Sequence, residues 1–328
     1  MVQHQSANVN ANNASNGNPS NNGPLVIDTQ HEDMVHDSQL NYYGTTLATA
    51  SSDRTVKIYE VGATYQHTGT ISGHQGPVWE VAWSHPKFGT LLASCSFDGT
   101  AMIHRESQPR NWTKIHHYQS SASASSSINS VQFSPHEFGL NLACASSSGT
   151  VAVLTHQADD SWSTATFTDN GLGTNSLSWA PYTNEGTEPT LRLVTGGCDN
   201  RIRFWAKNRE TGAWEEEGTL GEGAGHGDWV RDVAWAPSTS PGLDTVASCG
   251  EDGLVIIWTR RAGESVWNPF QLHSFGGPVW RVSWSVTGNI LAVSSGDSDV
   301  SLWKQTLDGN WQHISDVADT GGVVPGES

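Results

Sequence analysis

The stretch HGDWVRDVAWAPSTSPGLDTVASCGEDGLVIIW, residues 226–258, decides the fold. It contains three short runs of strand-forming residues, at 230–235, 246–249 and 255–258. In the first run alternate side chains fall on opposite faces, as the two-residue period of a strand requires. A loop rich in Pro, Ser and Gly follows this run, and Glu251-Asp252-Gly253 predicts a tight turn before the third run. We therefore expect three short strands joined by turns.

The same unit recurs along the chain. Asp252 lies six residues before Trp258, and this step returns at Asp199/Trp205 and Asp297/Trp303, with weaker versions at Asp53/Tyr59, Asp98/His104 and Ser148/Leu154. The turn positions 53, 98, 148, 199, 252 and 297 are 45, 50, 51, 53 and 45 residues apart. A period somewhat above ~40 residues, with a Gly-His start and a Trp-Asp type end, is typical of the WD repeat. The sequence therefore predicts an all-β fold, a six-bladed WD-repeat β-propeller.

The repeats also set the expected domain boundaries. Six repeats cover about 31–62, 74–107, 124–157, 170–207, 226–261 and 275–306, each followed by an outer strand, so that the propeller spans residues 25–317. Residues 1–24 are rich in Asn and poor in apolar side chains, and such a segment buries too little surface to offset its ordering entropy. We expect a disordered tail there, a flexible loop at Ser120–Ser127 and a short polar tail at 318–328.

Counting strands leaves one segment over. Each repeat supplies three inner strands and its own outer strand, which completes six blades, and Leu25–Asp28 remains as a strand-like run before the first repeat. Most propellers close by letting one terminus complete the blade that the other begins. A spare strand is instead an exposed edge, which invites pairing with another chain. Leu25–Asp28 could equally lie against the sixth blade as an extra edge strand, and the count alone does not decide between the two.

Charge and cysteine content exclude several functions. The formal net charge is −17, and 16 basic residues are spread over 328 positions, whereas phosphate binding needs clustered Lys and Arg. No apolar run is long enough to span a bilayer. We therefore expect no nucleic-acid ligand, no direct membrane insertion, and a cytosolic or nuclear protein. The four cysteines, Cys95, Cys144, Cys198 and Cys249, fall in four different repeats without a CxxC pair, which favours buried thiols over a metal site. We expect no metal and no cofactor.

Three repeats combine the residue types of a hydrolase triad. The sets are His31, Thr49 and Asp53; His74, Ser94 and Asp98; and His226, Ser248 and Asp252 with Trp258. Ser, His and Asp together can activate a nucleophile. A catalytic site would occur once, however, whereas this set recurs in graded form, as expected of buried hydrogen-bond networks that tie strands together. We interpret these residues as structural tetrads, expect no catalytic residue and predict that the chain is not an enzyme.

The strings within the repeats resemble one family of propellers in particular. They are His31–Asp37, Tyr42–Gly44, Ser51–Ile58, Gly73–Trp83, His85-Pro86, Ser134–Gly139, Gly196–Asn200, Asp228–Pro237, Asn289–Ser294 and Trp311 with Ser315–Val317. They are similar to successive blades of the small β-propeller subunit of the outer cage of the COPII vesicle coat, which is also found in the Y-shaped scaffold of nuclear pores. The likeness runs from about residue 25 to 317. The Asn-rich head, the serine loop and His104 in place of the usual Trp depart from the family pattern.

The resemblance implies a structural scaffold subunit for vesicle budding from the endoplasmic reticulum to the Golgi and for the nuclear pore. That family is an open six-bladed propeller, and an α-solenoid partner completes it by inserting a blade between the first and last blades. The implied partners are the α-solenoid coat subunit of the COPII cage and the α-solenoid nucleoporin of the Y-shaped complex. The implied locations are the cytoplasmic face of the endoplasmic reticulum, COPII vesicles, the cytosol and the nuclear pore complex at the nuclear envelope. Leu25, Val26 and Ile27 would flank the donated blade on one side, and Trp311, Ile314 and Val317 on the other.

Two other functions stay open from the sequence. A generic WD-repeat adaptor with a self-closed ring would recruit other proteins and behave as a stable monomer. A hydrolase would show a single solvent-open triad, and a single Ser→Ala change would abolish its activity while the fold is retained.

Overall fold

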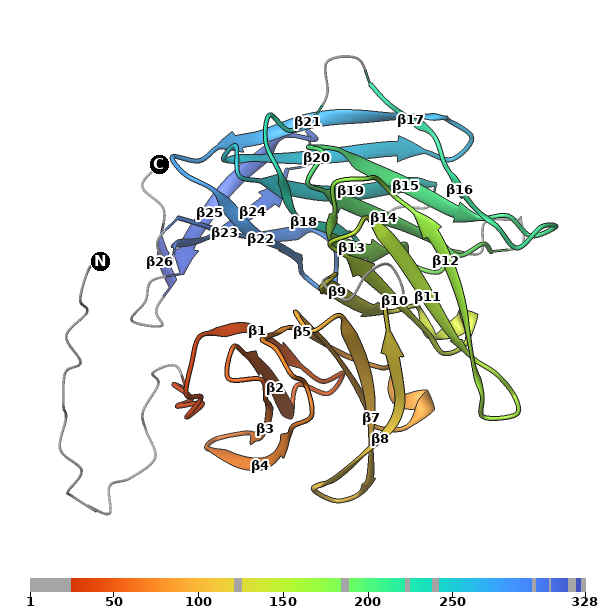
Figure 1. Cartoon of the computed structure of the whole chain (residues 1–328). Helices are drawn as coiled ribbons and strands as arrows, with labels where there is room; N and C mark the ends of the chain where they lie inside the picture. Colours follow the sequence, from red (N-terminus) through yellow and green to blue (C-terminus); the bar gives the residue numbers. More distant parts are fainter. Residues whose placement is uncertain are drawn as a thin grey trace.

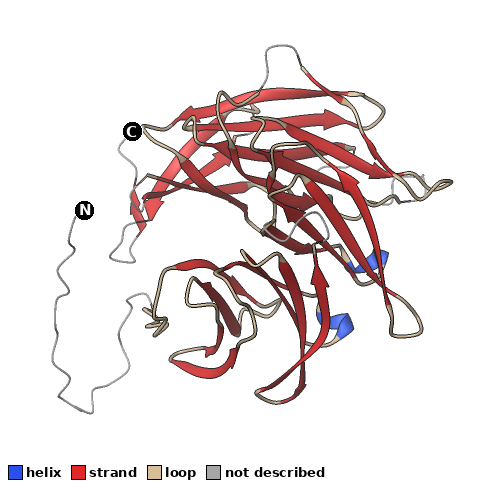
Figure 2. Cartoon of the chain, in the orientation of Figure 1, coloured by secondary structure: helices blue, strands red, loops and turns tan. Residues whose placement is uncertain are grey.

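The computed structural model describes residues 25–120, 126–183, 189–221, 225–237, 242–296, 299–306, 308–317 and 323–325. It is an all-β, six-bladed propeller, as predicted (Figure 1). Two short 3-10 turns, η1 (Pro86–Phe88) and η2 (His136–Phe138), are the helical elements of the described residues (Figure 2). The expected Asn-rich tail, most of the serine loop and Asp297 lie outside these residues.

The first three blades are regular four-stranded antiparallel sheets. Blade 1 contains β1 (Val35–Leu40), β2 (Thr46–Ser51), β3 (Val56–Val61) and β4 (Tyr65–Ile71). Blade 2 contains β5 (Val78–Trp83), β6 (Leu91–Ser96), β7 (Thr100–Gln108) and β8 (Asn111–Gln119). Blade 3 contains β9 (Ile128–Phe133), β10 (Asn141–Ser146), β11 (Thr150–His156) and β12 (Trp162–Thr168).

The last three blades differ at their outer edges. Blade 4 contains β13 (Thr174–Trp179), β14 (Arg192–Gly197), β15 (Ile202–Lys207) and β16 (Trp214–Glu216). Blade 5 contains β18 (Val230–Trp235), β19 (Leu243–Gly250), β20 (Leu254–Arg261) and β21 (Val266–Ser274), with β17 (Thr219–Leu220) at its edge. Blade 6 contains β22 (Val279–Trp284), β23 (Ile290–Ser295), β24 (Asp299–Gln305), β25 (Trp311–Val317) and β26 (Val323–Pro325).

The outer segment after blade 4 departs from the simple repeat. The sequence predicted a single outer strand after the fourth repeat, but β16 pairs with blade 4 while β17 pairs in parallel with β21 of blade 5. The break falls at Glu217-Gly218, where Gly218 adopts a φ of 77°. A left-handed residue turns the chain out of its sheet, which is why glycine suits this point. The segment therefore links two blades instead of completing one.

The core lies between neighbouring blades. Each blade turns one apolar face to the next, so the middle strands are buried on both sides and their sequences are continuous apolar runs. In the cluster between blades 2 and 3, for example, Ala93 and Ile103 of blade 2 pack with Val131 and Leu142 of blade 3. Four more such clusters follow the ring, and they bury most of the large side chains.

The ring is open between blades 6 and 1. The innermost strands pack on one another in the order β1, β5, β9, β13, β18 and β22, and no comparable packing joins β22 back to β1 in the described residues. Figure 1 shows blade 1 (red) and blade 6 (blue) as the two ends of the ring. We call the space between these two blade faces the seam.

Candidate functional site

The first strand of blade 1 is uncovered at the seam. Val35 begins β1 and its side chain is 39% exposed, whereas its counterparts Val78, Val230 and Val279 at the start of β5, β18 and β22 are 0% exposed. Those three residues belong to the clusters that each blade forms with the blade before it. Blade 1 has no preceding blade, so the same position lacks its cover. Leu40, at the other end of β1, is 54% exposed.

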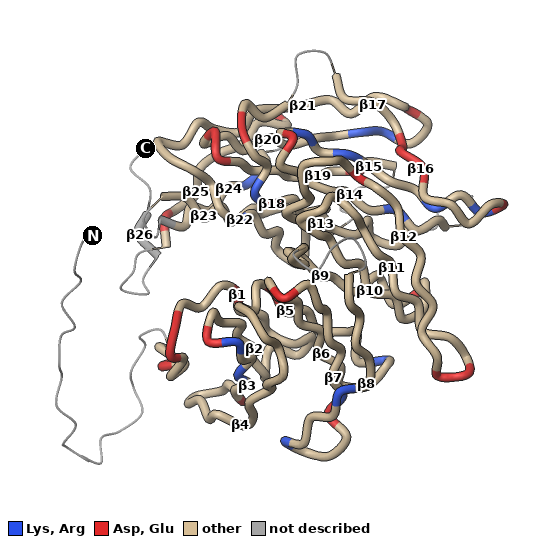
Figure 3. Tube along the Cα trace, viewed as in Figure 1, with Lys and Arg blue, Asp and Glu red and all other residues tan. Residues whose placement is uncertain are grey.

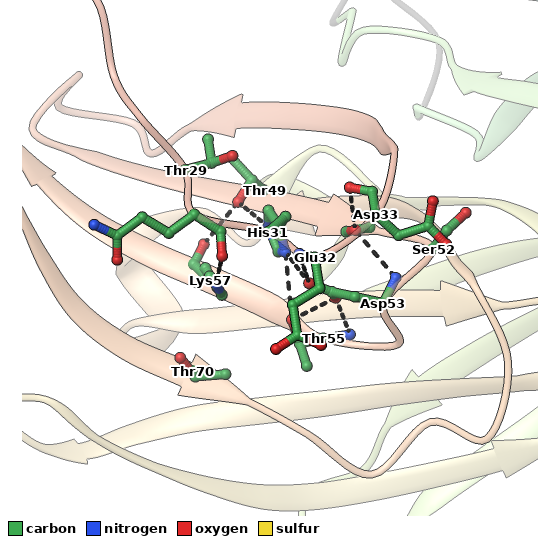
Figure 4. A network of polar contacts seen from close by, with 12 residues as sticks. Thr29, His31, Glu32, Asp33, Thr49, Ser52, Asp53, Thr55, Lys57 and Thr70 are labelled. Carbon is green, nitrogen blue, oxygen red and sulfur yellow. Dashed lines mark hydrogen bonds and ion pairs between the residues drawn. The ribbon is translucent and has the colours of Figure 1, made fainter. Parts of the chain in front are cut away.

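The N-terminal segment lies on the seam face of blade 1. The Asp28 amide donates to Tyr65 Oη at 3.2 Å, the Tyr59 hydroxyl donates to the Thr29 carbonyl, and Lys57 Nζ donates to the Gln30 carbonyl. Figure 4 shows Thr29, Lys57 and Thr49 on the same side of the blade. Residues 25–30 form no strand in the described chain, so the expected strand at Leu25–Asp28 has no pairing partner here.

The apolar residues of that segment remain accessible. Leu25 is 43% exposed, Val26 is 79% exposed and Ile27 is half-buried. The hydrogen bonds of residues 28–30 hold the segment against blade 1 without covering these side chains. Their assignment to the partner-binding seam stays a prediction, and it is compatible with where they lie.

The opposite wall of the seam is the outer face of blade 6. Ile314 and Val317 on β25 occupy the positions that Ile115 and Tyr118 hold on β8 of blade 2, since the two strands pair with β24 and β7 in the same register. Ile115 and Tyr118 pack against the cluster that blade 2 forms with blade 3. Ile314 is 41% exposed because no blade follows blade 6. These two residues therefore face the seam.

Trp311 does not face the seam, and this corrects the sequence interpretation. Its ring lies 5.7 Å from that of Trp284 and packs against the cluster between blades 5 and 6. Alternate residues of a strand point to opposite faces, and the irregular register near Ile314 reverses the alternation within β25. Counting alternate residues from Trp311 to Val317 would place both side chains on the same face, because it does not include this irregularity.

The predicted tetrad of blade 1 is formed. His31 Nδ1 lies 2.6 Å from Asp53 Oδ2, and His31 Nε2 lies 2.8 Å from Thr49 Oγ1 (Figure 4). Burial alone would raise the pKa of Asp53, but hydrogen bonds from Thr55, His31 and the Glu32 amide outweigh it and lower the pKa to about 2. The carboxylate therefore stays ionised and holds the loop before β1 to the turn before β3.

Blades 2 and 5 repeat the arrangement. His74 Nε2 lies 2.8 Å from Ser94 Oγ, and its Nδ1 lies 3.4 Å from Asp98. In blade 5, His226 Nε2 lies 2.8 Å from Ser248 Oγ, which also accepts a bond from Trp258 Nε1 at 2.9 Å, and His226 Nδ1 lies 3.1 Å from Asp252. All three histidine side chains are almost fully buried.

Blade 4 contains a related network that sequence reasoning missed. Asp169 occupies the place of the histidine: its Oδ1 accepts bonds from Thr195 Oγ1 at 2.6 Å and Trp205 Nε1 at 3.3 Å. Arg203 lies 4.0 Å from Asp169 and 2.5 Å from Asp199, so it supplies the positive charge that two carboxylates need. A search for histidine does not find Asp169 in this role, although the Asp199/Trp205 step in the sequence indicated the repeat that forms blade 4.

His104 replaces the usual Trp in blade 2 and is a poor substitute. Its side chain is buried, and Nδ1 has no hydrogen-bond partner in the described residues. Burial, with the nearby His74 and Lys114, lowers the pKa of His104 to about 4. The folded protein therefore keeps this imidazole neutral.

Replacing His104 with Phe is expected to reduce the acid sensitivity of folding. In the unfolded chain the His104 imidazole takes up a proton near pH 6.5, but in the folded protein only near pH 4. As the pH falls from 6.5 to 4, the free energy of unfolding of the wild type should therefore decrease by about 3 kcal/mol more than that of His104→Phe. Urea unfolding at several pH values between 7.5 and 4 measures the difference. Parallel stability curves for the two proteins would contradict the assignment.

The hydroxyl groups of the three networks are buried. Each nucleophile candidate, Thr49, Ser94 or Ser248, is at most 2% exposed, so a substrate has no access to it.

Within the described ranges, no three His, Cys, Asp or Glu side chains are grouped so that they could hold a metal ion. No helix in the described part of the chain is long and apolar enough to cross a membrane. Acidic and basic residues are interspersed along the trace of the blades (Figure 3).

Comparison with known proteins agrees with the repeat pattern. The model of the WD domain, G-beta repeat, matches residues 23–60, 65–105, 217–259 and 268–304. The Drosophila melanogaster protein named Protein SEC13 homolog is 44% identical over 303 residues, which cover 88% of this chain and 82% of the relative. Protein transport protein sec13 of Emericella nidulans is 44% identical over 310 residues, covering 89% of this chain and 98% of the relative. The chain belongs to the Sec13 family.

A further relative extends this match and a solved structure agrees with the fold. Protein transport protein sec13 of Aspergillus clavatus is 46% identical over 302 residues, covering 87% of this chain and 99% of the relative. A chain of the crystal structure of the mitotic checkpoint complex superposes with a TM-score of 0.64 at 21% identity, covering 84% of this chain and 76% of that one, and supports the propeller fold alone. Sec13-family membership and the WD-repeat fold indicate a structural protein and not an enzyme.

Proposed function

We propose that this Sec13-family chain is a scaffold subunit of the COPII outer cage and that it accepts a blade from an α-solenoid coat subunit at the seam. The relatives are named as protein transport proteins, which supports a role in vesicle transport at the endoplasmic reticulum. The observation that carries the proposal is the exposure of Val35, a position that is fully buried in blades 2, 5 and 6. An inserted blade would bury it.

The donated blade would fit between the exposed faces of blades 6 and 1. Ile314 and Val317 would pack on one of its faces, and Leu25, Val26 and Ile27 would flank it on the other side. Burial of apolar side chains between blades would stabilise the complex, as it does between the blades of the chain itself. Strand pairing along Leu25–Ile27, which has no partner strand in the free chain, would add main-chain hydrogen bonds.

The same surface supports a second role at the nuclear pore. We infer that an α-solenoid nucleoporin of the Y-shaped complex would use the same seam, so the two partners would compete for one protein. This location rests on the family resemblance. The alternative of a generic adaptor requires a self-closed ring, and β22 and β1 lack the packing that joins the other neighbouring innermost strands in the described residues, which argues against it.

Size-exclusion chromatography with light scattering tests the proposal. The full chain is run alone and after co-expression with a solenoid fragment of the COPII coat that carries the candidate insertion blade. We expect a one-to-one complex with the fragment and poor solubility or self-association without it, because the open seam exposes apolar side chains. The same fragment without its insertion blade serves as the control and should not bind. A heat-stable monomer that ignores the complete fragment would support the self-closed adaptor instead.

A further inference from the structure

Six side chains occupy equivalent positions on the innermost strands of the six blades. Each follows an irregularity in the pairing of its innermost strand, which turns the side chain inward. In blade order they are Asp37, Glu80, Ser130, Ser176, Asp232 and Arg281. Five of the six, all but Ser130, line one cavity of about 900 Å³. Arg281 is the one basic residue of the set, and it lies on the last blade before the seam.

The acidic members of this set connect each blade to the next. Asp37 of blade 1 accepts a bond from the Val81 amide of blade 2 at 3.1 Å, and Glu80 of blade 2 accepts from the Val131 amide of blade 3 at 2.7 Å. Asp232 of blade 5 likewise accepts from the Val282 amide of blade 6 at 3.0 Å. These bonds run in one direction around the ring.

Arg281 cannot continue this series, because a guanidinium accepts no hydrogen bond. It instead reaches across the cavity: Nη1 lies 3.3 Å from Glu80 Oε1, and Nη2 lies 3.9 Å from Asp37 Oδ1. These contacts join blade 6 to blades 2 and 1, on the far side of the seam. The two carboxylates are 15% and 8% exposed and the Arg281 side chain is 43% exposed, so solvent screens these ion pairs in part from the arginine side.

We propose that Arg281 is an ionic clasp that holds the first and last blades at a fixed separation and so positions the seam for its partner. No apolar cluster joins blades 6 and 1 in the described residues, so the clasp acts where the packing of the ring is interrupted. Without the guanidinium, the carboxylates of Asp37 and Glu80, which lie on neighbouring blades, would repel each other. The first blade would then move more freely against the last.

Hydrogen exchange of the full chain without any partner tests the clasp. Arg281→Met removes the charge, and Arg201→Met, at an exposed position of blade 4, is the matched control. We expect amides of β1 and β22 to exchange about fivefold faster in Arg281→Met, with β13 unchanged, as expected for the loss of a modest ion-pair network. The pKa of Glu80 is raised to about 7, chiefly by burial; Arg281 acts to lower this pKa and Asp37 acts to raise it. The exchange is therefore measured at pH 8, so that Glu80 is ionised in the wild type.

A double-mutant cycle with Glu80→Gln separates the clasp from a local defect. The glutamine oxygen can still accept from the Val131 amide while the charge is lost. We expect Arg281→Met with Glu80→Gln to exchange no faster than Arg281→Met alone, because both changes break one interaction. Additive effects, or exchange in Arg281→Met equal to that in Arg201→Met, would overturn the proposal. Added NaCl gives a check without mutation, since it should speed exchange of β1 in the wild type.

The binding consequence rests on the proposed function. If the clasp positions the seam, Arg281→Met should weaken the affinity for the solenoid fragment about fivefold. If the wild-type chain does not bind the fragment, the proposed function is wrong. The hydrogen-exchange experiment, which needs no partner, still tests whether Arg281 holds the first and last blades together. If the wild type and Arg281→Met bind equally well, the positioning role is wrong.

Discussion

Replacing Ile314 with Asp is expected to lower the affinity for a solenoid fragment carrying the insertion blade by about 100-fold or more. Ile314 is 41% exposed in the free chain, so the carboxylate is solvated there and the fold is retained. Its counterpart Ile115 is packed against the next blade, which indicates that an inserted blade would bury position 314 in the same way. A carboxylate at that position would then lose its water without gaining a partner. Isothermal titration calorimetry measures the loss.

Leu172→Asp is the matched control for this variant. Leu172 is 69% exposed and precedes β13 of blade 4, so it is an apolar surface residue remote from the seam in the ring. Both variants should keep the thermal stability of the wild type to within a small change, and Leu172→Asp should keep the full affinity as well. If Ile314→Asp binds the fragment as tightly as Leu172→Asp does, the outer face of blade 6 is not the binding surface.

Much of the fold could be predicted because the repeat places the same local signals in every blade. The turn at Glu251-Asp252-Gly253 and the apolar run that ends at Trp258 predict two strands and their connection, and β19 and β20 pair around this turn. A blade cannot bury its faces alone, so repeated units imply a ring of neighbours. The six-bladed fold follows from that reasoning and is confirmed, and the hydrogen bonds expected around His31, His74 and His226 are present.

The seam was predicted less completely, because its residues depend on register. Ile314 and Val317 lie on the face of β25 that is turned to the seam, and their role in partner binding stays a prediction. Trp311 packs between blades 5 and 6, because a strand irregularity that no sequence signal marks reverses the alternation between it and Val317. Asp169 was missed for a different reason. It replaces histidine by an acidic residue, and only the spatial proximity of Arg203 shows how the added negative charge is balanced.

Replacing Trp258 with Ala is expected to destabilise the propeller by about 3–5 kcal/mol. The side chain is 0% exposed and lies in the cluster between blades 4 and 5 with Val194 and Phe204. Truncation opens a cavity there and removes the bond from the indole N–H to Ser248 Oγ. Trp229→Ala, at a 46% exposed position where the ring contacts Arg231, should cost about 1 kcal/mol or less. Chemical denaturation of the four proteins, wild type, both alanine variants and Trp258→Phe, gives these values.

Trp258→Phe separates packing from hydrogen bonding within this prediction. Phenylalanine keeps most of the apolar contact with Val194 and Phe204 but has no N–H for Ser248. The Ser248 hydroxyl still has His226 Nε2 at 2.8 Å, so the loss of one bond should cost only about 1–2 kcal/mol. If Trp258→Phe were as destabilising as Trp258→Ala, the hydrogen-bond network would dominate and not the packing of the two blades. Each blade would then owe its stability chiefly to the polar tetrad within it, and blades 3 and 6, which lack the histidine, should be the first to exchange their amides.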